Sequence, residues 1–414
     1  GREALFIYFQ ALLVAGAGSQ PIVFAFSAVA MGMLTIALTY RLFATMFGRW
    51  TGLFSAGLLA TSFWFVDLSR FGLRTTSLPP LLVLSLYCLW RTFRSGQRRF
   101  AVFGGVALGL SLYTYIASRL VPLLIVLVCL AHWRLALQRW RQLLLLVVVS
   151  VVVFAPEGAY FVQHRQELLQ RQSDVSVFNP NPDVEGSHDT PIQSILNTAG
   201  MFFVRGDENI RHDIPHRPVF DPVLAAFFVA GLGFALWRAR HDARYRWPLL
   251  WLVVMSLPSA LSHESPSMFR SVSMAPAAFF FPGLALAEIG RWRTAAYALG
   301  AALLVASAAV TFYLYFDQWA GDPRTYWAFD GNVTRLAGFV AGTPPGQAYL
   351  ALDHRSTVEF LAPISQTDRW QREESAGIPV PAQASDVLYV AGPQSAMATS
   401  LPQILPGAVP LPHT

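Results

Sequence analysis

The sequence contains no lysine: all 30 of the basic residues among its 414 positions are arginines. Charged residues of both signs make up only 13% of the chain, against roughly 25% in ordinary soluble domains. Hydrophobic residues make up 54%, and a soluble fold, which must cover itself with polar side chains, has no place for that much apolar surface. The same composition excludes disordered, collagen-like and disulfide-scaffold proteins. An integral membrane protein with several spans remains.

Cysteines and nucleotide-binding glycine patterns are also scarce. The two cysteines, Cys88 and Cys129, lie inside apolar runs, where we interpret them as packing residues. No GxGxxG or P-loop pattern occurs, so an activated substrate is not expected to be a cytosolic nucleotide. The net charge of +6 does not indicate nucleic acid, because the arginines stand in short clusters between apolar runs and not on a basic face with exposed aromatics.

Ten apolar runs are candidate membrane spans, since a span needs about 20 mostly apolar residues. They lie at 21–40, 50–66, 76–91, 100–116, 119–133, 142–159, 219–237, 247–261, 270–289 and 294–316. The predicted fold class is therefore an all-α polytopic membrane protein with about ten transmembrane helices.

The arginines orient these spans. Alternate loops are rich in arginine, and the positive-inside rule places such loops on the cytoplasmic side. These arginines are Arg41, Arg49, Arg91, Arg94, Arg98, Arg99, Arg134, Arg139, Arg141, Arg238, Arg240, Arg244, Arg246, Arg291 and Arg293. The opposite short loops carry only Arg70, Arg74, Arg119 and Arg270. We expect a multi-pass protein of the inner cell membrane with its polar material outside.

This orientation predicts the domain organisation. An extracytoplasmic interfacial helix at 1–20 precedes transmembrane helices at 21–159, an extracytoplasmic loop at 160–218, transmembrane helices at 219–316 and an extracytoplasmic C-terminal domain at 317–414. The last contains the strand-like runs Ala348–Leu352 and Val387–Val390, which favour a small α/β region.

Arginines outside the membrane run against the topology bias, which makes them candidates for binding an anionic substrate. A guanidinium group binds phosphate through two parallel hydrogen bonds. Simpler explanations stay open: headgroup anchoring by Arg2, a helix-end pair of Asp67 with Arg70, and an interfacial aromatic belt containing Tyr115. The candidate substrate-binding residues are Arg2, Glu3, Arg70, Arg74, Tyr115, Arg119, His263 and Arg270.

Two outer segments contain groups suited to acid–base or metal chemistry. His263 and Glu264 are capable of proton transfer. In the segment 205–218, His212, Asp213 and His216 are metal-ligand types, but their spacing matches no zinc pattern and Pro215 argues against a shared helical face. We expect no metal centre or other cofactor, with a divalent metal left open, and we interpret this segment as a solvated loop over the membrane domain.

Several motifs, taken in order, resemble one family. They are Arg-Glu-x-Leu-Phe-Ile-Tyr at 2–8, Phe-Gly-Arg-x-x-Gly-Leu at 47–53, Ser-Arg-Phe-Gly-Leu-Arg at 69–74, Leu-Tyr-Thr-Tyr-x-x-x-Arg at 112–119, Arg-Gly-Asp-x-Asn-x-Arg at 205–211 and the turn from Pro266 to Arg270. Over residues 1 to about 335 the chain resembles bacterial dolichyl-phosphate-mannose protein mannosyltransferase-like (Rgt-like) glycosyltransferases of the GT-C fold, which are related to aminoarabinose transferases.

The resemblance implies a reaction. The donor would be a sugar on a polyprenyl phosphate, and transfer to a lipid, glycan or protein acceptor would occur on the extracytoplasmic face with inversion. An acidic residue of the first external loop would act as general base. Arg2 matches by position the basic residue that contacts the lipid phosphate in the related aminoarabinose transferases.

One part of the family pattern is missing. The first span and the external Asp-Glu motif of the family lie upstream of the motif at 2–8, so we expect the catalytic acid upstream of residue 1, with Asp67 and Glu264 as less favoured substitutes. A transporter or flippase of a lipid-linked or anionic substrate is the alternative. It predicts ionisable residues or broken helices at mid-membrane, whereas the spans here are almost free of charge in their interiors. A non-catalytic membrane scaffold is a third possibility.

Overall fold

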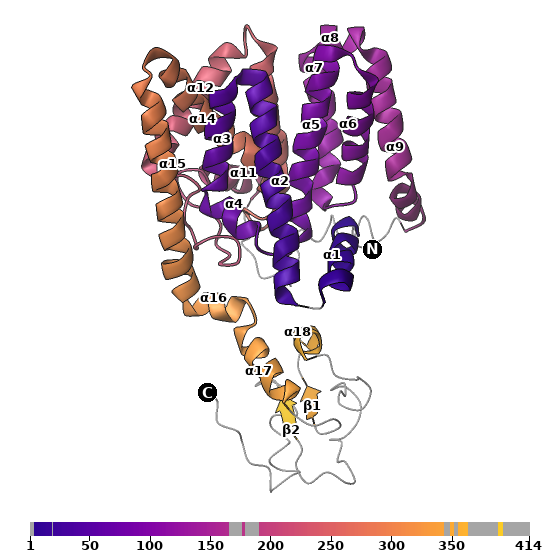
Figure 1. The fold of residues 1–414 in the computed structure, drawn as a ribbon, viewed down its shortest axis with the longest axis vertical. Helices are drawn as coiled ribbons and strands as arrows, with labels where there is room; N and C mark the ends of the chain where they lie inside the picture. Colours follow the sequence, from indigo (N-terminus) through magenta and orange to yellow (C-terminus); the bar gives the residue numbers. More distant parts are fainter. Residues whose placement is uncertain are drawn as a thin grey trace. The chain divides into compact units, whose positions relative to one another are not determined.

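The computed structural model describes residues 4–18, 20–164, 176–178, 190–342, 348–351, 355–362 and 388–391, and a helix lies at each of the ten apolar runs (Figure 1). The longer helices are α1 (Leu5–Ala17), α2 (Pro21–Phe47), α3 (Arg49–Ala60), α5 (Leu78–Ser95), α6 (Arg98–Ser111), α7 (Val121–Ala131), α9 (Trp140–Gln163), α11 (Pro191–Gly200), α12 (Pro222–Arg238), α13 (Arg246–Ala260), α14 (Ala275–Trp292), α15 (Ala295–Tyr313) and α17 (Gly331–Ala341).

Shorter elements connect the helices. They are α4 (Phe63–Leu68), α8 (Trp133–Gln138), α16 (Pro323–Ala328) and α18 (Arg355–Leu361), the 3₁₀ turns η1 (Arg74–Ser77), η2 (Ile116–Leu120), η3 (Ala243–Tyr245) and η4 (Val272–Met274), the π-helical segment η5 (Leu314–Trp319), and the strands β1 (Ala348–Ala351) and β2 (Leu388–Ala391).

By length and composition, four of the described helices are able to cross a membrane. They comprise Pro21–Phe47, Trp140–Gln163, Val272–Trp292 and Tyr297–Trp319. Three shorter apolar helices, Leu5–Ala17, Ile116–Ala131 and Pro222–Arg238, accompany them. The structure therefore has the apolar helices of a membrane protein, and the number of ten crossings stays a prediction.

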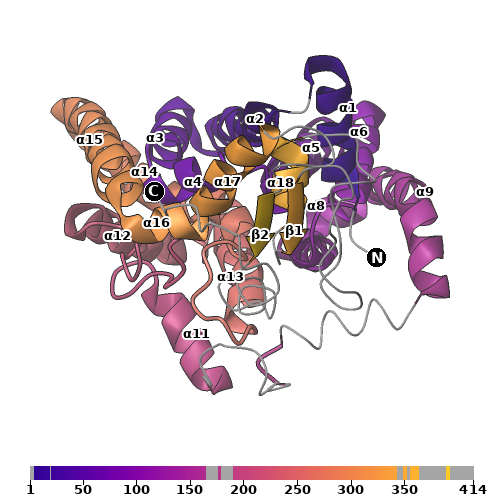
Figure 2. The same cartoon turned by 90° about the horizontal axis from the view of Figure 1, so that it is seen from below.

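The helices of the unit Gly1–Gly321 pack side by side in the order α9, α6, α5, α2, α3, α14, α12. Helix α14 is almost entirely buried, whereas α9 and α15 are largely exposed and lie at opposite outer edges of the bundle (Figures 1 and 2). Exposed apolar helices of this kind suit a lipid environment.

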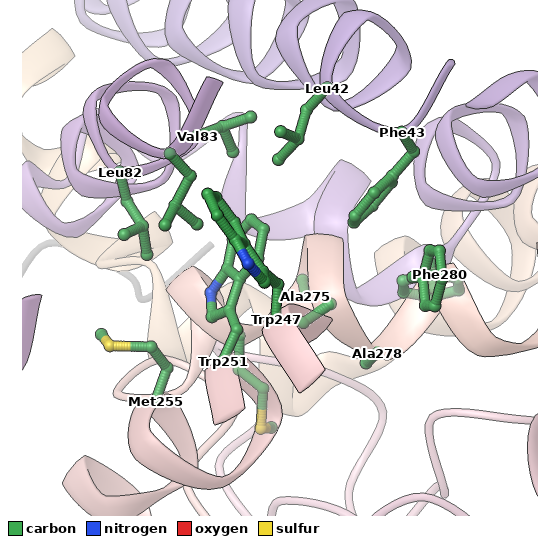
Figure 3. Close-up of a cluster of buried hydrophobic side chains, with 14 of the residues drawn as sticks. Leu42, Phe43, Leu82, Val83, Trp247, Trp251, Met255, Ala275, Ala278 and Phe280 are labelled. Atoms are coloured by element: carbon green, nitrogen blue, oxygen red, sulfur yellow. The ribbon is translucent and has the colours of Figure 1, made fainter. Parts of the chain in front are cut away.

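Large side chains from four helices fill the core near α14. Figure 3 shows Leu42 and Phe43 of α2, Leu82 and Val83 of α5, Trp247, Trp251 and Met255 of α13, and Ala275, Ala278 and Phe280 of α14. The rings of Phe43 and Phe280 lie 4.6 Å apart between centroids. The buried indole N–H of Trp251 donates to the Ser273 carbonyl at 2.8 Å, so this polar atom does not oppose burial.

One predicted span is two helices. The run 50–66 breaks after Ala60, where α3 ends, and α4 begins at Phe63 with Ser62 as its N-cap. The freed carbonyl of Thr61 accepts hydrogen bonds from the hydroxyls of Thr311 (2.7 Å) and Ser307 (3.3 Å) on α15. Because these hydroxyls satisfy the carbonyl, the break costs little in apolar surroundings.

The unit Asp322–Thr414 contains α16, α17, α18 and two strands. β1 and β2 pair in parallel; β1 lies within the first predicted strand-like run, and β2 overlaps the second and ends one residue beyond it, at Ala391. Val333, Val340 and Val358 pack together between α17 and α18. Asp322 caps α16 by accepting a hydrogen bond from the backbone N–H of Arg324 at 2.8 Å.

Gly231 of α12 tests the close helix packing. A Cβ there would lie 1.9 Å from the carbonyl oxygen of Phe281 on α14, whereas a Cβ at Gly233 would meet nothing within 4 Å. We expect Gly231→Ala to lower the free energy of unfolding by about 1–3 kcal/mol, and Gly233→Ala in the same helix to be neutral or stabilising by up to about 1 kcal/mol. Thermal unfolding in detergent measures both, and equal midpoints would contradict the packing.

Candidate functional site

A run of side chains in ring contact joins four segments at one end of the bundle. The Arg74 guanidinium lies 5.7 Å from the centroid of the Tyr115 ring. The Tyr115 ring meets the edge of Phe269 at 5.6 Å, and the Phe269 ring stacks on His212 at 5.2 Å. Side chains from η1, the turn before η2, the turn before η4 and the loop at 201–221 therefore form one continuous surface.

The Asp207 carboxylate is the polar centre of this surface. Its Oδ1 accepts the backbone N–H of Asn209 at 2.8 Å, and its Oδ2 accepts the backbone N–H of Met268 at 2.8 Å. His212 Nδ1 lies 2.9 Å from the same Oδ2. The carboxylate thus ties its own loop to the turn that carries Phe269.

The loop around Asp207 is closed at its base by backbone hydrogen bonds. The N–H of Gly206 donates to the His216 carbonyl at 3.1 Å, and the N–H of His216 donates to the Asp207 carbonyl at 2.8 Å. A Cβ at position 206 would lie 1.9 Å from the Arg217 carbonyl oxygen, so only glycine fits there. His216 has a φ of 66°, which turns the chain back on itself.

The same loop carries the buried carboxylate of Asp213. Asp213 has no exposed surface and forms a two-pronged ion pair with Arg217, with Nε to Oδ1 at 2.9 Å and Nη2 to Oδ2 at 3.1 Å. Burial raises the pKa of Asp213 to about 6, against the opposing effect of Arg217. The Arg217 guanidinium also lies over the Phe63 ring at 4.8 Å.

Asp67 on α4 is fully buried, and neither of its carboxylate oxygens has a hydrogen-bond partner among the described residues. Burial raises its pKa well above the ordinary value, and the negative charge of Asp213 raises it further, while Arg70 and Arg217 oppose both. The helix-end hydrogen bond between Asp67 and Arg70 that the sequence suggested is absent from the described contacts. Asp67 is not accessible to an acceptor in this structure.

Arg70 instead donates to the hydroxyl of Tyr315, and its guanidinium lies 4.8 Å from the centroid of the same ring. Tyr315 packs on Trp319 at 4.9 Å. The indole N–H of Trp319 donates to the carbonyl of Ile210 at 2.7 Å. Arg70 is therefore linked through η5 to the loop that carries His212.

The remaining predicted residues lie around this centre. Glu264 and Arg270 form an ion pair of 2.7 Å within one turn. His263 is half-buried in that turn, and Arg119 lies 5.8 Å from the centroid of the Phe161 ring at the end of α9. Arg2 and Glu3 lie outside the described residues. Within the described parts of the chain no group of three or more histidine, cysteine or acidic side chains is arranged to hold a metal ion.

Three further hydrogen bonds hold the surrounding elements. Gln10 of α1 donates from Nε2 to the Gly72 carbonyl at 2.8 Å and to the Ser27 hydroxyl at 3.2 Å, which fixes the loop between Arg70 and Arg74 against α1 and α2. On the other side, the Ser194 hydroxyl of α11 donates to the Ser262 carbonyl at 3.0 Å, and α11 lies next to α13 (Figure 2).

The sequence missed four residues of this centre as site candidates: Asp207, His212, Asp213 and Arg217. All four lie in the outer segment 205–218, where His212 and Asp213 were weighed only as metal ligands and Asp207 only as part of the motif at 205–211. A histidine five positions after an aspartate in a loop is a signal for a hydrogen-bonded pair, but the contacts of Asp207 with Met268 cross 61 residues of chain.

Comparisons with known proteins support these observations. The family model described as dolichyl-phosphate-mannose-protein mannosyltransferase matches residues 4–160. No curated protein matches the sequence.

Solved structures match over nearly the whole chain. ArnT from Cupriavidus metallidurans, solved with undecaprenyl phosphate bound, aligns with a TM-score of 0.54 and 16% identity over 97% of this chain and 78% of that chain. The same protein in its apo state aligns with a TM-score of 0.56 and 14% identity over 98% of this chain and 78% of that chain. The oligosaccharyltransferase of Archaeoglobus fulgidus, in complex with zinc and sulfate, aligns with a TM-score of 0.55 and 16% identity over 88% of this chain and 53% of that chain. At these identities the likeness shows the fold, so the predicted all-α GT-C fold class is confirmed.

Asp67→Asn tests the buried carboxylate. Because the native pKa of Asp67 is raised, the folded state binds its proton more tightly than the unfolded state does. Its contribution to stability is therefore present at low pH and is lost as the pH rises above 3.8 and through the native pKa. We expect the variant to gain thermal stability over the wild type as the pH rises from about 5 to 8.

The exposed Asp317→Asn is the matched control for the loss of one carboxylate. Thermal midpoints in detergent across this range measure both variants. If the thermal midpoints of Asp67→Asn and the wild type differ by the same amount at every pH, the raised pKa of Asp67 is contradicted.

Proposed function

We propose that the protein is a membrane glycosyltransferase that moves a sugar from a polyprenyl-phosphate donor to an acceptor hydroxyl. The observation that carries this function is the joining of arginines and aromatic rings into one surface at the end of a bundle of apolar helices. An anionic headgroup on a long hydrocarbon chain requires both features, positive groups at the membrane edge and apolar helices beside them.

The comparisons support the same reaction. ArnT was solved with undecaprenyl phosphate bound, and the family model that matches residues 4–160 describes a transferase that uses dolichyl-phosphate mannose. The family description names a transferase, and the ArnT structure holds a polyprenyl phosphate; together they favour transfer over the alternative of transport.

Arg70 is the side chain best placed to bind the donor phosphate. It is exposed, and its partners among the described residues are the hydroxyl and ring of Tyr315, which carry no negative charge. Negative charge increases on the phosphate as the bond to the sugar breaks, so a fixed guanidinium stabilises the transition state more than the bound donor. Arg74, above Tyr115, extends the positive surface toward His212.

We further propose that this surface faces the outside of the inner membrane. The arginine-rich turns, including the one at α8, lie at the end of the bundle opposite to α4 (Figure 1). The domain boundaries at 1–20, 160–218 and 317–414 belong to the same proposal.

Single cysteines test this orientation. In a variant with Cys88 and Cys129 replaced by serine, we expect a cysteine at Glu208 to react in intact cells with a thiol reagent that cannot cross the membrane. A cysteine at Gln97 is expected to react only after the membrane is opened. Both side chains are exposed, so accessibility to solvent is matched. The reverse labelling pattern would contradict the orientation.

Arg70→Gln tests the donor site. Transfer of labelled sugar from a panel of undecaprenyl-phosphate hexoses and pentoses is measured in native membranes, which contain the natural acceptor. We expect the variant to lose about 10–100-fold in kcat/KM for the donor, the effect of one charge-assisted hydrogen bond. Arg134→Gln, an exposed arginine of the opposite end, is the control and is expected to keep full activity. Equal activity of the two variants would reject Arg70 as the phosphate ligand.

A further inference from the structure

We propose that a group of arginines at the α8 end of the bundle binds the headgroup of an anionic phospholipid, whose hydrocarbon chains lie along the exposed face of α9. The arginines of this lipid site are Arg94, Arg98 and Arg99, around the turn from α5 to α6, and Arg139 and Arg141, where α9 begins. The lipid site is separate from the proposed donor site at the opposite end, and it does not depend on the transfer reaction.

Charge balance separates these arginines from the others. No aspartate or glutamate occurs between Asp67 and Glu157, so the chain around the lipid site supplies no negative charge of its own. The described acids at this end of the bundle are each paired with a different arginine. These pairs are Asp242–Arg244 and Glu288–Arg291, both at 2.6 Å. Like charges held near one another repel, and an anion from outside the chain removes this repulsion.

The partners of the exposed arginines in the lipid site are uncharged. Arg94 and Arg141 lie over tryptophan rings, with 6.0 Å and 5.5 Å between the guanidinium carbon and the ring centroid. Arg99 donates from Nε to the side-chain oxygen of Gln97 at 2.8 Å. These contacts orient the guanidinium groups without neutralising them, so their full charge is available to an anion.

The two elements that carry these arginines are held together. Gln142 of α9 donates from Nε2 to the Gly96 carbonyl at 3.1 Å. Gly96 has a φ of 65°, and a Cβ there would lie 2.5 Å from Nη1 of Arg139. The Arg139 guanidinium therefore lies directly against the turn from α5 to α6. Positive groups from two elements meet at one place, as the binding of a phosphate by several donors requires.

The exposed face of α9 favours a lipid over other anions. Trp140 is 55% exposed at the start of the helix, and Leu144, Val147 and Val151 follow it on the same face, each more than half exposed. A tryptophan at the head of an apolar stripe is typical of the headgroup level of a bilayer, and the Arg141 guanidinium lies over that ring. A soluble phosphate or an acidic protein would use the arginines but not the stripe.

An anionic phospholipid matches both parts of the lipid site. Its phosphate accepts paired hydrogen bonds from guanidinium groups, and its chains cover the apolar stripe. Basic groups beside membrane helices recognise anionic lipids in this way. Phosphatidylcholine carries a cation next to its phosphate, which the arginines repel. We therefore expect phosphatidylglycerol to bind more tightly than phosphatidylcholine.

A double variant, Arg98→Gln with Arg141→Gln, tests the lipid site. Both side chains are exposed, so the fold and the thermal midpoint without lipid are expected to persist. The delipidated full chain in detergent is titrated with phosphatidylglycerol, and the bound lipid is measured by native mass spectrometry. An arginine near an anionic lipid contributes about 5-fold in affinity, so we expect the double variant to bind about 25-fold more weakly.

Arg240→Gln with Arg293→Gln is the matched control. Both arginines are exposed at the same end but outside the lipid site, so the double variant loses the same charge and is expected to bind as the wild type does. An equal loss in the two double variants would overturn the lipid site, because overall charge would then explain the binding. Equal affinity of the wild type for phosphatidylcholine would overturn it as well. So would displacement of phosphatidylglycerol by equal concentrations of inorganic phosphate or of a polyglutamate peptide, since neither has chains to cover α9.

Discussion

Backbone groups in the apolar part of this molecule have no water to bind, and this constraint decides where its helices end. At the C-terminus of α2, Arg244 donates to the Met46 carbonyl at 2.9 Å and Arg291 donates to the Phe47 carbonyl at 3.2 Å. Arg244 lies in η3 and Arg291 in the last turn of α14, both distant in sequence from α2. The arginine clusters that orient the protein therefore also complete its helices, since a cation at a helix C-terminus satisfies carbonyls and favours the helix dipole.

The same constraint shapes the opposite end, where the chain makes tight turns and short helices around the loop at 201–221. Every such turn frees polar groups that need partners. Asp207 takes up the N–H groups of Asn209 and Met268, and Ser194 of α11 donates to the Ser262 carbonyl. The polar groups that build the candidate site are thus first of all structural, and the reactive atoms are those that remain after these needs are met. The guanidinium of Arg70, whose described partner is the uncharged Tyr315, is one of them.

Much of the helical fold could be predicted from the sequence, because a run of apolar residues between arginine or proline clusters has few alternatives in a membrane. The break between α3 and α4 could not. It depends on Ser307 and Thr311 of α15, which satisfy Thr61 from about 250 positions away. The four helices that are long enough to cross were evident from hydropathy, whereas the shorter ones depend on packing that a single sequence does not encode locally.

For the site, the sequence identified outer arginines such as Arg70 and Arg270, but neither Arg217 nor the differences between their partners. Arg217 and Arg270 are each neutralised by a carboxylate, Asp213 and Glu264. Arg70 meets the neutral Tyr315 instead, and the acid three residues before it, Asp67, is buried with a raised pKa that favours its uncharged form. An arginine whose charge is not balanced by an ion pair loses least when it binds a phosphate, because no existing salt bridge has to break. Judged only by their position outside the membrane, these arginines are equivalent. Their partners in the fold distinguish the one suited to bind an anion.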